Sequence, residues 1–159
     1  MRDFESLGGD VVIKPIFGAE GRGITRLNDE AVAWRVFKTY DQLGHLIYLQ
    51  EFLPHGNVDY RVLILGSHMY GMRRSNPHDW RTNVSLGAVA EPIDVTNEMA
   101  DLSWRAASAI GAPFVGVDLL RADDGRLFVI EVNAVPGWRG LSRALGVDIA
   151  HELLNWLKQ

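Results

Sequence analysis

The sequence predicts an α+β fold whose strands pair mainly as antiparallel hairpins. Two pairs of apolar segments support this prediction. The first pair, Asp59–Leu65 and His68–Arg74, is joined by Gly66-Ser67, which suits a tight turn. The second pair, Phe114–Arg121 and Leu127–Asn133, is joined by four turn-forming residues. Other segments repeat apolar residues at helical spacing, so helices should pack on these strands.

Length, composition and charge are those of a soluble globular protein. The 159 residues are enough to bury a core, and 47% are hydrophobic and 23% charged. A net charge of −4 without a basic run argues against nucleic acid as a partner. Cysteine is absent, which excludes disulfides, thiolate metal sites and a catalytic thiol. No apolar stretch is long enough for a membrane span and the start is not a signal peptide, so we expect a cytoplasmic protein.

The first residues read as the end of a helix that Gly8-Gly9 would cap. A strand, Val11–Lys14, follows and should stop at Pro15. Because a fold rarely begins with the tail of a helix, we expect the chain to be a fragment of a longer protein.

A glycine-rich segment follows this strand, with Gly18, Gly21 and Gly23 ahead of a second short strand at Thr25-Arg26. The tip of such a hairpin can close over phosphate groups and donate backbone N–H groups to them. The spacing fits neither a Walker A loop nor a dinucleotide fingerprint. A plain glycine-rich turn is the alternative, although Lys14 beside the loop favours phosphate binding.

The remaining elements follow from helical and strand patterns. A helix should begin at the N-cap Asn28, bury Leu43 among its apolar residues and end at Gly44. An apolar strand, residues 46–53, should stop at Pro54, and a second helix should begin after Thr96. A final helix should run from Val147 to Lys158.

The second hairpin displays oxygen ligands on one face. If Ala122 pairs with Leu127, Asp118 lies opposite Glu131, and Asn133 follows on the same face. The other face would carry Val115, Val117 and Leu119 against Phe128, Ile130 and Val132. Two carboxylates and an amide suit magnesium, which completes its shell with waters and phosphates. A solvated outer face is the alternative, and these residues alone leave both open.

Arginines lie on or beside the first hairpin, at Arg61, Arg73 and Arg74. A buried arginine needs an anionic partner, whereas an arginine at an exposed strand end does not. Both interpretations stay open, and exposure is a plausible state for Arg74. The segment from Ser75 to Gly87 lacks periodicity and should be a loop, the type of segment in which functional residues are frequent.

Four features in this order resemble the ATP-grasp superfamily, specifically the RimK-type alpha-L-glutamate ligases. They are Lys14 before the glycine-rich hairpin, the proline-ended strand with Gln50-Glu51-Phe52-Leu53, the pair Asp59-x-Arg61, and the closing hairpin with Asp118 and Glu131-x-Asn133-x-x-Pro136-Gly137. The resemblance covers residues 11–157. It implies a fold of two α+β subdomains that is incomplete at the N-terminus, with residues 1–54 carrying the glycine-rich loop and hinge strand and residues 55–159 carrying the magnesium site.

The resemblance also implies roles for residues that bind ATP. Lys14 would neutralise its phosphates, and the loop from Gly18 to Gly23 would close over them. The hinge segment, Gln50 to Leu53, would offer backbone groups of Glu51 and Leu53 to the adenine edge. Asp59 would accept a hydrogen bond from the ribose.

A second set of implied roles concerns the reacting groups. Arg61 and Arg73 would face phosphate or an acyl-phosphate. Arg81 and Asn83 match the Arg-Ser-Asn segment of the family. The implied magnesium ligands, with manganese as an alternative metal, are Asp118, Glu131 and Asn133.

The implied activity is ATP-dependent ligation of an amine to a carboxylate. The acceptor carboxylate would attack the γ-phosphate to give an acyl-phosphate, and an amino acid, with glutamate as first choice, would then displace phosphate. The implied partners are ATP, the amino acid and a carboxylate-bearing acceptor, and a homo-oligomer is left open. Two departures from the family are noted: a missing upstream part with another lysine, and a turn before Glu131 that is one residue longer.

Two other interpretations compete with ligation. The chain could be a non-catalytic nucleotide-binding or structural remnant of an ATP-grasp protein, which the missing upstream lysine favours. It could instead be a protein-binding domain, with Trp80 and Trp138 on loops as anchors.

Overall fold

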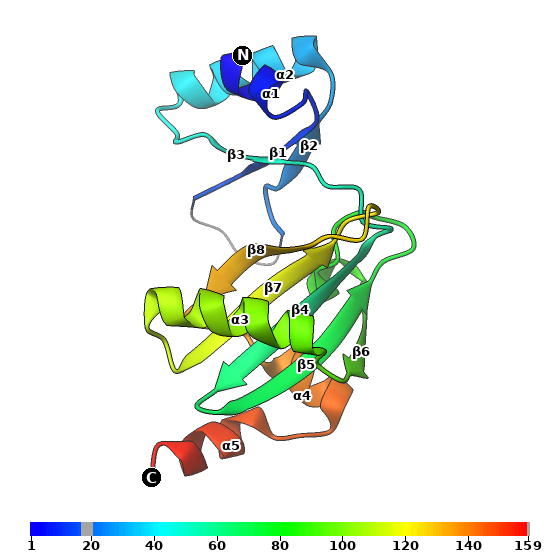
Figure 1. Ribbon diagram of the computed structural model, residues 1–159. Helices are drawn as coiled ribbons and strands as arrows, with labels where there is room; N and C mark the ends of the chain where they lie inside the picture. The colour runs from blue at the N-terminus through cyan, green and yellow to red at the C-terminus, as the bar shows by residue number, and fades with distance from the viewer. Residues whose placement is uncertain (17–20, 159) are drawn as a thin grey trace. The chain divides into compact units, whose positions relative to one another are not determined.

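The computed structural model describes residues 1–16 and 21–158, and the chain divides into two compact units (Figure 1). Unit 1 is Met1–Leu53 and unit 2 is Pro54–Gln159. This division lies one residue from the boundary expected from the sequence. No helix among the described residues has the length and apolar character needed to cross a bilayer.

Unit 1 is a small antiparallel sheet covered by two helices on one face. Its elements are α1 (Arg2–Ser6), β1 (Val11–Lys14), β2 (Thr25–Leu27), α2 (Glu30–Gln42) and β3 (Tyr48–Glu51). The strand order is β2-β1-β3, so the predicted hairpin between β1 and β2 is confirmed. The core joins both helices to the sheet and consists of Phe4, Val11, Ile13, Leu27 and Ala33.

Helix α2 begins one residue later than the sequence pattern predicts. Its N-cap is Asp29, whose side chain accepts a hydrogen bond of 2.8 Å from the Val32 N–H. The prediction of Asn28 as N-cap is therefore wrong. The helix ends at Gln42, so Leu43 falls in the C-cap position and is 63% exposed instead of facing the core.

Unit 2 is built on a five-stranded antiparallel sheet of order β6-β5-β4-β7-β8. Its strands are β4 (Val58–Leu65), β5 (His68–Ser75), β6 (Val89–Ile93), β7 (Phe114–Arg121) and β8 (Leu127–Asn133). Both predicted hairpins are present. A two-residue turn joins β4 to β5, because Leu65 pairs with His68.

Helices cover both faces of this sheet (Figure 1). Helix α3 (Asn97–Ile110) packs on one face, against Val62, Ile64, Val115, Val117 and Leu119. Helices α4 (Arg139–Leu145) and α5 (Ile149–Trp156) pack on the other face, against Leu63 and Met72. A short 3₁₀ helix, η1 (Val84–Leu86), lies in the loop between β5 and β6.

The hairpin of β7 and β8 contains a bulge that changes its register. Near the turn, Arg121 pairs with Leu127, so the predicted pairing of Ala122 with Leu127 is wrong by one residue. A register shift follows between Asp118 and Leu119, and beyond it Asp118 lies opposite Glu131, as predicted. An extra residue in one strand produces this combination.

The bulge also decides which residues of β8 face the core. Leu127, Val129 and Val132 pack against the cluster under α3. The prediction that Phe128 and Ile130 face the core is wrong. Side chains alternate along a strand, and the bulge shifts this alternation by one residue. The prediction for Val132 is confirmed, since it lies on the far side of the bulge.

Replacing Asp29 by Ala should destabilise α2, because the Val32 N–H loses its acceptor. We expect a loss of about 1 kcal/mol in the free energy of unfolding. Hydrogen exchange of the Val32 amide, together with urea denaturation, measures this effect. Asn28→Ala is the matched control and should change little; a larger effect at Asn28 than at Asp29 would contradict the assigned cap.

Candidate functional site

Three charged residues form a row across neighbouring strands of unit 2. Arg61 on β4 lies opposite Asp118 on β7, and Asp118 lies opposite Glu131 on β8. Their side chains are on the face that α4 and α5 cover, since Leu63 has the same parity as Arg61 and packs against those helices. The bulge preserves this row, which brings a cation and two carboxylates together.

Asp118 is buried and is held by two arginines. The Arg61 Nε donates to its Oδ1 and the Arg61 Nη2 to its Oδ2, each at 2.6 Å. The Arg74 Nη2 lies 3.1 Å from the same Oδ2. Oδ2 therefore faces two arginine donors and Oδ1 faces one. The pair of Arg61 with Asp118 is bidentate, a geometry that is strong and directional.

Arg74 continues the network to a second buried carboxylate. Its Nε and Nη2 donate to the two carboxylate oxygens of Asp59 at 2.7 and 2.5 Å. Both residues are 4% exposed. The result is a chain of alternating charges in the order Arg61, Asp118, Arg74, Asp59. Burial of these charges is tolerated because each has a partner of opposite sign.

The pKa values of the network follow from burial and pairing. Burial alone would raise the pKa of Asp118, but Arg74 and Arg61 outweigh burial and lower it. Burial raises the pKa of Asp59, and the charge and hydrogen bonds of Arg74 offset only part of this rise. Burial would lower the pKa of Arg74, whereas the two carboxylates raise it above its ordinary value. Asp118 is therefore the carboxyl that stays ionised to lower pH.

Glu131 and Asn133 supply further oxygens beside Asp118. Glu131 is exposed, and Asn133 lies two residues later on the same face of β8. The Asn133 Oδ1 accepts a hydrogen bond of 2.9 Å from the Val135 N–H, which fixes the side chain and leaves a second lone pair on that oxygen.

The oxygens of Asp118, Glu131 and Asn133 are hard ligands of the type that magnesium prefers. No group of three or more His, Cys, Asp or Glu side chains in the described part of the chain could hold a metal. A magnesium site here therefore needs the Asn133 amide as its third protein ligand. The residue types fit such a site, and the Asp118 Oδ1 faces one arginine donor where Oδ2 faces two.

The loop from Asn76 to Gly87 is tethered beside this network. The buried Asn76 donates from Nδ2 to the carbonyl oxygens of Arg81 and Leu86, at 3.1 and 3.4 Å. The His55 Nε2 lies 3.0 Å from the Trp80 carbonyl oxygen. Thr82 is buried, and its side-chain hydrogen bond to Asp59 offsets a small part of the rise that burial causes in the pKa of that carboxyl. The loop is thus anchored to the same chain of charges.

Arg81, predicted to act at the site, is held within this loop by Asp79. The Arg81 Nη2 donates to the Asp79 Oδ2 at 2.6 Å, and the hydrogen bond lowers the pKa of Asp79. The Arg81 side chain is 32% exposed. It can therefore exchange Asp79 for another anion without leaving a buried charge. Asn83, at the N-cap of η1, accepts from the Leu86 N–H with its carbonyl oxygen.

Arg73 is not brought to the site. It lies opposite Tyr60, on the face that packs against α3, and pairs with Glu91 at 2.9 Å. The role implied for Arg73 is therefore not supported, because Arg73 and Arg61 lie on opposite faces of the sheet. The neighbouring Arg74 lies on the same face as Arg61 and is buried, so of the two interpretations left open for it the buried arginine with an anionic partner is confirmed.

The ribose contact implied for Asp59 stays a prediction, and the structure shows what surrounds its carboxylate. Its carboxylate is buried and both oxygens accept hydrogen bonds from Arg74. These hydrogen bonds give Asp59 a structural role as the buried partner of Arg74.

Two of the predicted residues of unit 1, Lys14 and Gln50, lie on the face of its sheet that is turned away from the helices. Lys14 pairs with Tyr48 and Val12 with Gln50, so Lys14 and Gln50 share the face opposite Val11 and Ile13. The Gln50 Nε2 donates to the Tyr48 hydroxyl at 3.0 Å. This arrangement brings two of the predicted nucleotide-binding residues together within unit 1.

The loop and hinge residues are only partly described. Gly21 and Gly23 have φ angles of +74° and +78°, which favour glycine. Gly18 lies outside the described residues. The Phe52 N–H donates to the Asp10 carbonyl oxygen at 2.9 Å, while the implied adenine contacts of Glu51 and Leu53 stay predictions.

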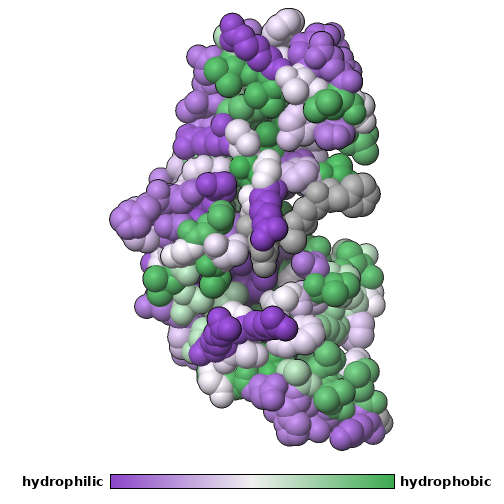
Figure 2. All heavy atoms as spheres, turned by 180° about the vertical axis from the view of Figure 1, so that it is seen from behind, coloured by the Kyte–Doolittle hydropathy of each residue, from purple (hydrophilic) through white to green (hydrophobic). Residues whose placement is uncertain are grey.

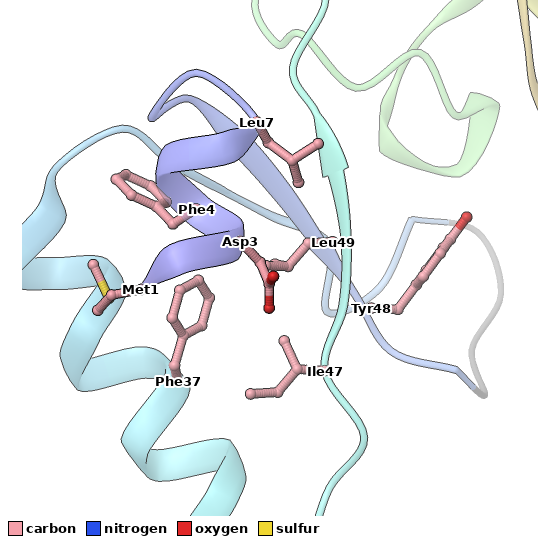
Figure 3. A pocket seen from close by; sticks show the side chains of 8 residues that line it. All are labelled: Met1, Asp3, Phe4, Leu7, Phe37, Ile47, Tyr48 and Leu49. Carbon is pink, nitrogen blue, oxygen red and sulfur yellow. The ribbon is translucent and has the colours of Figure 1, made fainter.

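Unit 1 also contains a cavity of about 430 Å³ (Figure 3). It is lined by Met1, Asp3, Phe4, Leu7, Phe37, Ile47, Tyr48 and Leu49. None of the predicted site residues lines it, so this cavity is not the candidate site. On the molecular face shown in Figure 2, hydrophobic and hydrophilic residues are interspersed on the surface of each unit.

The sequence interpretation missed Arg74 as a site residue, although a signal was present. The tight turn at Gly66-Ser67 sets Leu65 opposite His68. Counting away from the turn along both strands places Arg74 directly opposite Asp59. Opposite charges across a strand pair attract. The buried role of Asn76 had no comparable signal, because it depends on the path of an irregular loop.

Comparison with known proteins gives the chain a family context. The family described as the RimK-like ATP-grasp domain matches residues 3–157. The match therefore includes both units and all the residues of the charged row.

Three similar proteins illustrate the match. The tetrahydromethanopterin:alpha-L-glutamate ligase of Methanococcus maripaludis is 36% identical over 151 residues, which cover 92% of this chain and 51% of that protein. The alpha-aminoadipate–LysW ligase LysX of Sulfolobus acidocaldarius is 31% identical, covering 98% of this chain and 58% of that protein. The structure of the ATP-grasp ligase PsnB with a phosphomimetic variant of its minimal precursor, Mg and ADP has a TM-score of 0.72 and 25% identity, covering 98% of this chain and 48% of that chain. This chain thus spans about half the length of the curated relatives it matches.

Replacing Arg74 by Met should destabilise unit 2, because Asp59 loses its cation and Asp118 loses one of two. We expect a loss of about 3–5 kcal/mol in the free energy of unfolding, measured by urea denaturation. Arg73→Met is the matched control; its pair with Glu91 is exposed, so the loss should stay below about 1 kcal/mol.

The stability deficit of Arg74→Met should also depend on pH. Without Arg74, burial raises the pKa of folded Asp59 and the charge and hydrogen bonds of Arg74 no longer offset this rise. A carboxyl with a raised folded-state pKa favours folding at low pH and loses this contribution as pH rises. The deficit should therefore grow from about pH 4 to about pH 7. A deficit that shrinks over this range would show that Arg74 does not neutralise Asp59.

Proposed function

The chain belongs to the family of RimK-like ATP-grasp domains, and from this premise we propose that it takes part in ATP-dependent ligation of an amino acid to a carboxylate. We propose glutamate as the amino acid, because the curated relatives include alpha-L-glutamate ligases. The activity is proposed for the protein in which this chain functions, since the chain spans about half the length of those relatives.

The observation that carries this proposal is the row of Arg61, Asp118 and Glu131, with Asn133 beside it. The row combines a guanidinium, which suits phosphate oxygens, with three oxygen donors, which suit magnesium. A site that neutralises phosphate charge needs both types of group close together. The bulge in β8 supports the proposal, because it aligns Glu131 with Asp118 despite the shifted pairing near the turn.

Asp118, Glu131 and Asn133 would hold the magnesium or manganese ion. When bound, such a metal neutralises phosphate charge and acts as a Lewis acid at the transferring phosphoryl group. The PsnB structure that resembles this chain contains Mg and ADP, which agrees with this assignment. Arg74 would keep Asp118 ionised and oriented, because it contributes to the lowered pKa of that carboxyl.

The proposed reaction has two steps: the γ-phosphoryl group is transferred to the acceptor carboxylate, and the acyl group is then transferred to the amino acid. An acceptor carboxylate oxygen bonds to the γ-phosphorus of ATP, and the bond from that phosphorus to ADP breaks. The nitrogen of the amino acid then bonds to the acyl carbon, phosphate leaves with the bonding electrons, and the nitrogen loses a proton. No side chain acts as a nucleophile, so the protein contributes position and charge.

Arg61 and Arg81 are proposed to contact the phosphoryl groups. Arg61 is the outer arginine of the network, and Arg81 is held by the partly exposed Asp79. In unit 1 we propose Lys14 and the backbone of Gly21 and Gly23 as further phosphate contacts. This set excludes Arg73, which lies on the far face of the sheet from Arg61.

The backbone of the hinge segment 50–53 is proposed to contact adenine. Gln50 and Lys14 share the face of the unit 1 sheet that is turned away from the helices, which supports a nucleotide-binding role for that face. The contacts of Glu51 and Leu53 follow from the family resemblance.

Replacing Glu131 by Gln should weaken binding of a magnesium complex of a non-hydrolysable ATP analogue. We expect a loss of at least about tenfold in affinity by calorimetry, or about 1.4 kcal/mol, because an anionic ligand becomes neutral. Glu91→Gln is the matched control, since Glu91 is an exposed carboxylate that pairs with Arg73. Equal affinities for the two variants would place the metal elsewhere.

Ligation itself is tested by release of ADP from ATP in the presence of glutamate and a carboxylate-bearing acceptor. We expect ADP release that requires both substrates and falls at least about tenfold in Asp118→Asn, because the phosphate charge is no longer neutralised. Binding of the nucleotide without any ADP release would support the alternative of a non-catalytic nucleotide-binding domain.

A further inference from the structure

The two arginines that hold Asp118 differ in how firmly they are fixed. The Arg74 side chain is 5% exposed, and Arg61 is 16% exposed. Arg74 is bound by both oxygens of Asp59, whereas Arg61 donates its hydrogen bonds to Asp118. Arg61 is therefore the outer and more accessible member of the network.

Loss of Arg61 from Asp118 would not leave a buried, unpaired charge. Arg74 lies 3.1 Å from the Asp118 Oδ2 and stays anchored to Asp59. Asp118 would keep a cationic partner while its Oδ1, which Arg61 Nε holds at 2.6 Å, becomes open. The cost of moving Arg61 is thus lower than the cost of breaking an isolated buried pair.

The charge of the cluster indicates what could replace Arg61. Asp59, Asp118 and Glu131 carry three negative charges and Arg74 carries one positive charge, so a net charge of −2 remains without Arg61. A divalent cation balances this charge, whereas Arg61 balances half of it. The open Oδ1 of Asp118 lies on the face that also carries Glu131 and Asn133.

From these contacts we propose that Arg61 is an exchangeable counter-ion that occupies Asp118 until a metal–nucleotide complex arrives. The inference rests on the proposed function and adds a competition: Arg61 and the divalent cation use the same carboxylate. Free metal must displace Arg61 without offering it a new partner. A metal–nucleotide complex brings phosphate oxygens, to which the released guanidinium can bind.

This competition predicts opposite effects of one substitution under two conditions. Arg61→Gln removes the competing cation, so Mn²⁺ without nucleotide should bind at least about tenfold more tightly than to the wild type. The same variant loses a phosphate contact, so the Mn²⁺ complex of a non-hydrolysable ATP analogue should bind more weakly. Both affinities can be measured from the electron paramagnetic resonance signal of free Mn²⁺.

Control variants separate this effect from a general change of charge or fold. Arg121 lies on the same strand as Asp118, is partly exposed and pairs with Glu98. The variant Arg121→Gln should therefore match the wild type in both measurements. Arg61→Lys keeps the charge without the bidentate geometry, and its affinity for free Mn²⁺ should lie between wild type and Arg61→Gln. Adding Glu131→Gln to Arg61→Gln should abolish the gain.

The results also separate this inference from the proposed function. Equal or weaker binding of free Mn²⁺ by both Arg61 variants, compared with the wild type, would overturn the inference even if the nucleotide complex binds normally. A gain for free Mn²⁺ that depends on Glu131 would support the competition even if no variant binds nucleotide, an outcome that would count against the proposed function alone.

Discussion

The alternating ion pairs from Arg61 through Asp118 and Arg74 to Asp59 are the constraint on which the rest of unit 2 depends. Arg74 joins two buried carboxylates that would otherwise repel each other, and Thr82 ties the following loop to the same group. Because buried charges need directional partners, this network fixes the register of β4, β5 and β7. The exposed Glu131 and the half-buried Asn133 are then positioned by the neighbouring strand, so the site depends on the sheet behind it.

The sequence is sufficient to predict the hairpins and the position of Asp118 opposite Glu131, but not the register near the turn. Alternation placed Asp118 opposite Glu131 correctly, even though the assumed pairing of Ala122 was wrong by one residue. A bulge cannot be found from alternation alone, because it adds one residue to one strand and shifts the alternation beyond it. The same limit explains why Phe128 and Ile130 were expected in the core, where Leu127 and Val129 pack instead.

The arginines show what strand geometry adds to the sequence interpretation of the site. Arg73 and Arg74 are adjacent, so strand geometry sends their side chains to opposite faces. The residue of β4 that each arginine pairs with decides whether Arg73 or Arg74 reaches Asp118. The tight turn at Gly66-Ser67 sets this pairing. The family resemblance supplied the chemistry but selected Arg73, whereas the charge of Asp59 across the strand pair selects Arg74.

Paramagnetic broadening by Mn²⁺ tests the proposed metal site most directly, because it reports position independently of turnover. The measurement is an amide NMR spectrum of the chain with a non-hydrolysable ATP analogue, before and after addition of Mn²⁺. We expect the strongest broadening at the amides of Asp118, Glu131 and Asn133. Broadening centred on other residues, with these three signals unchanged, would contradict the assignment of the metal to this row.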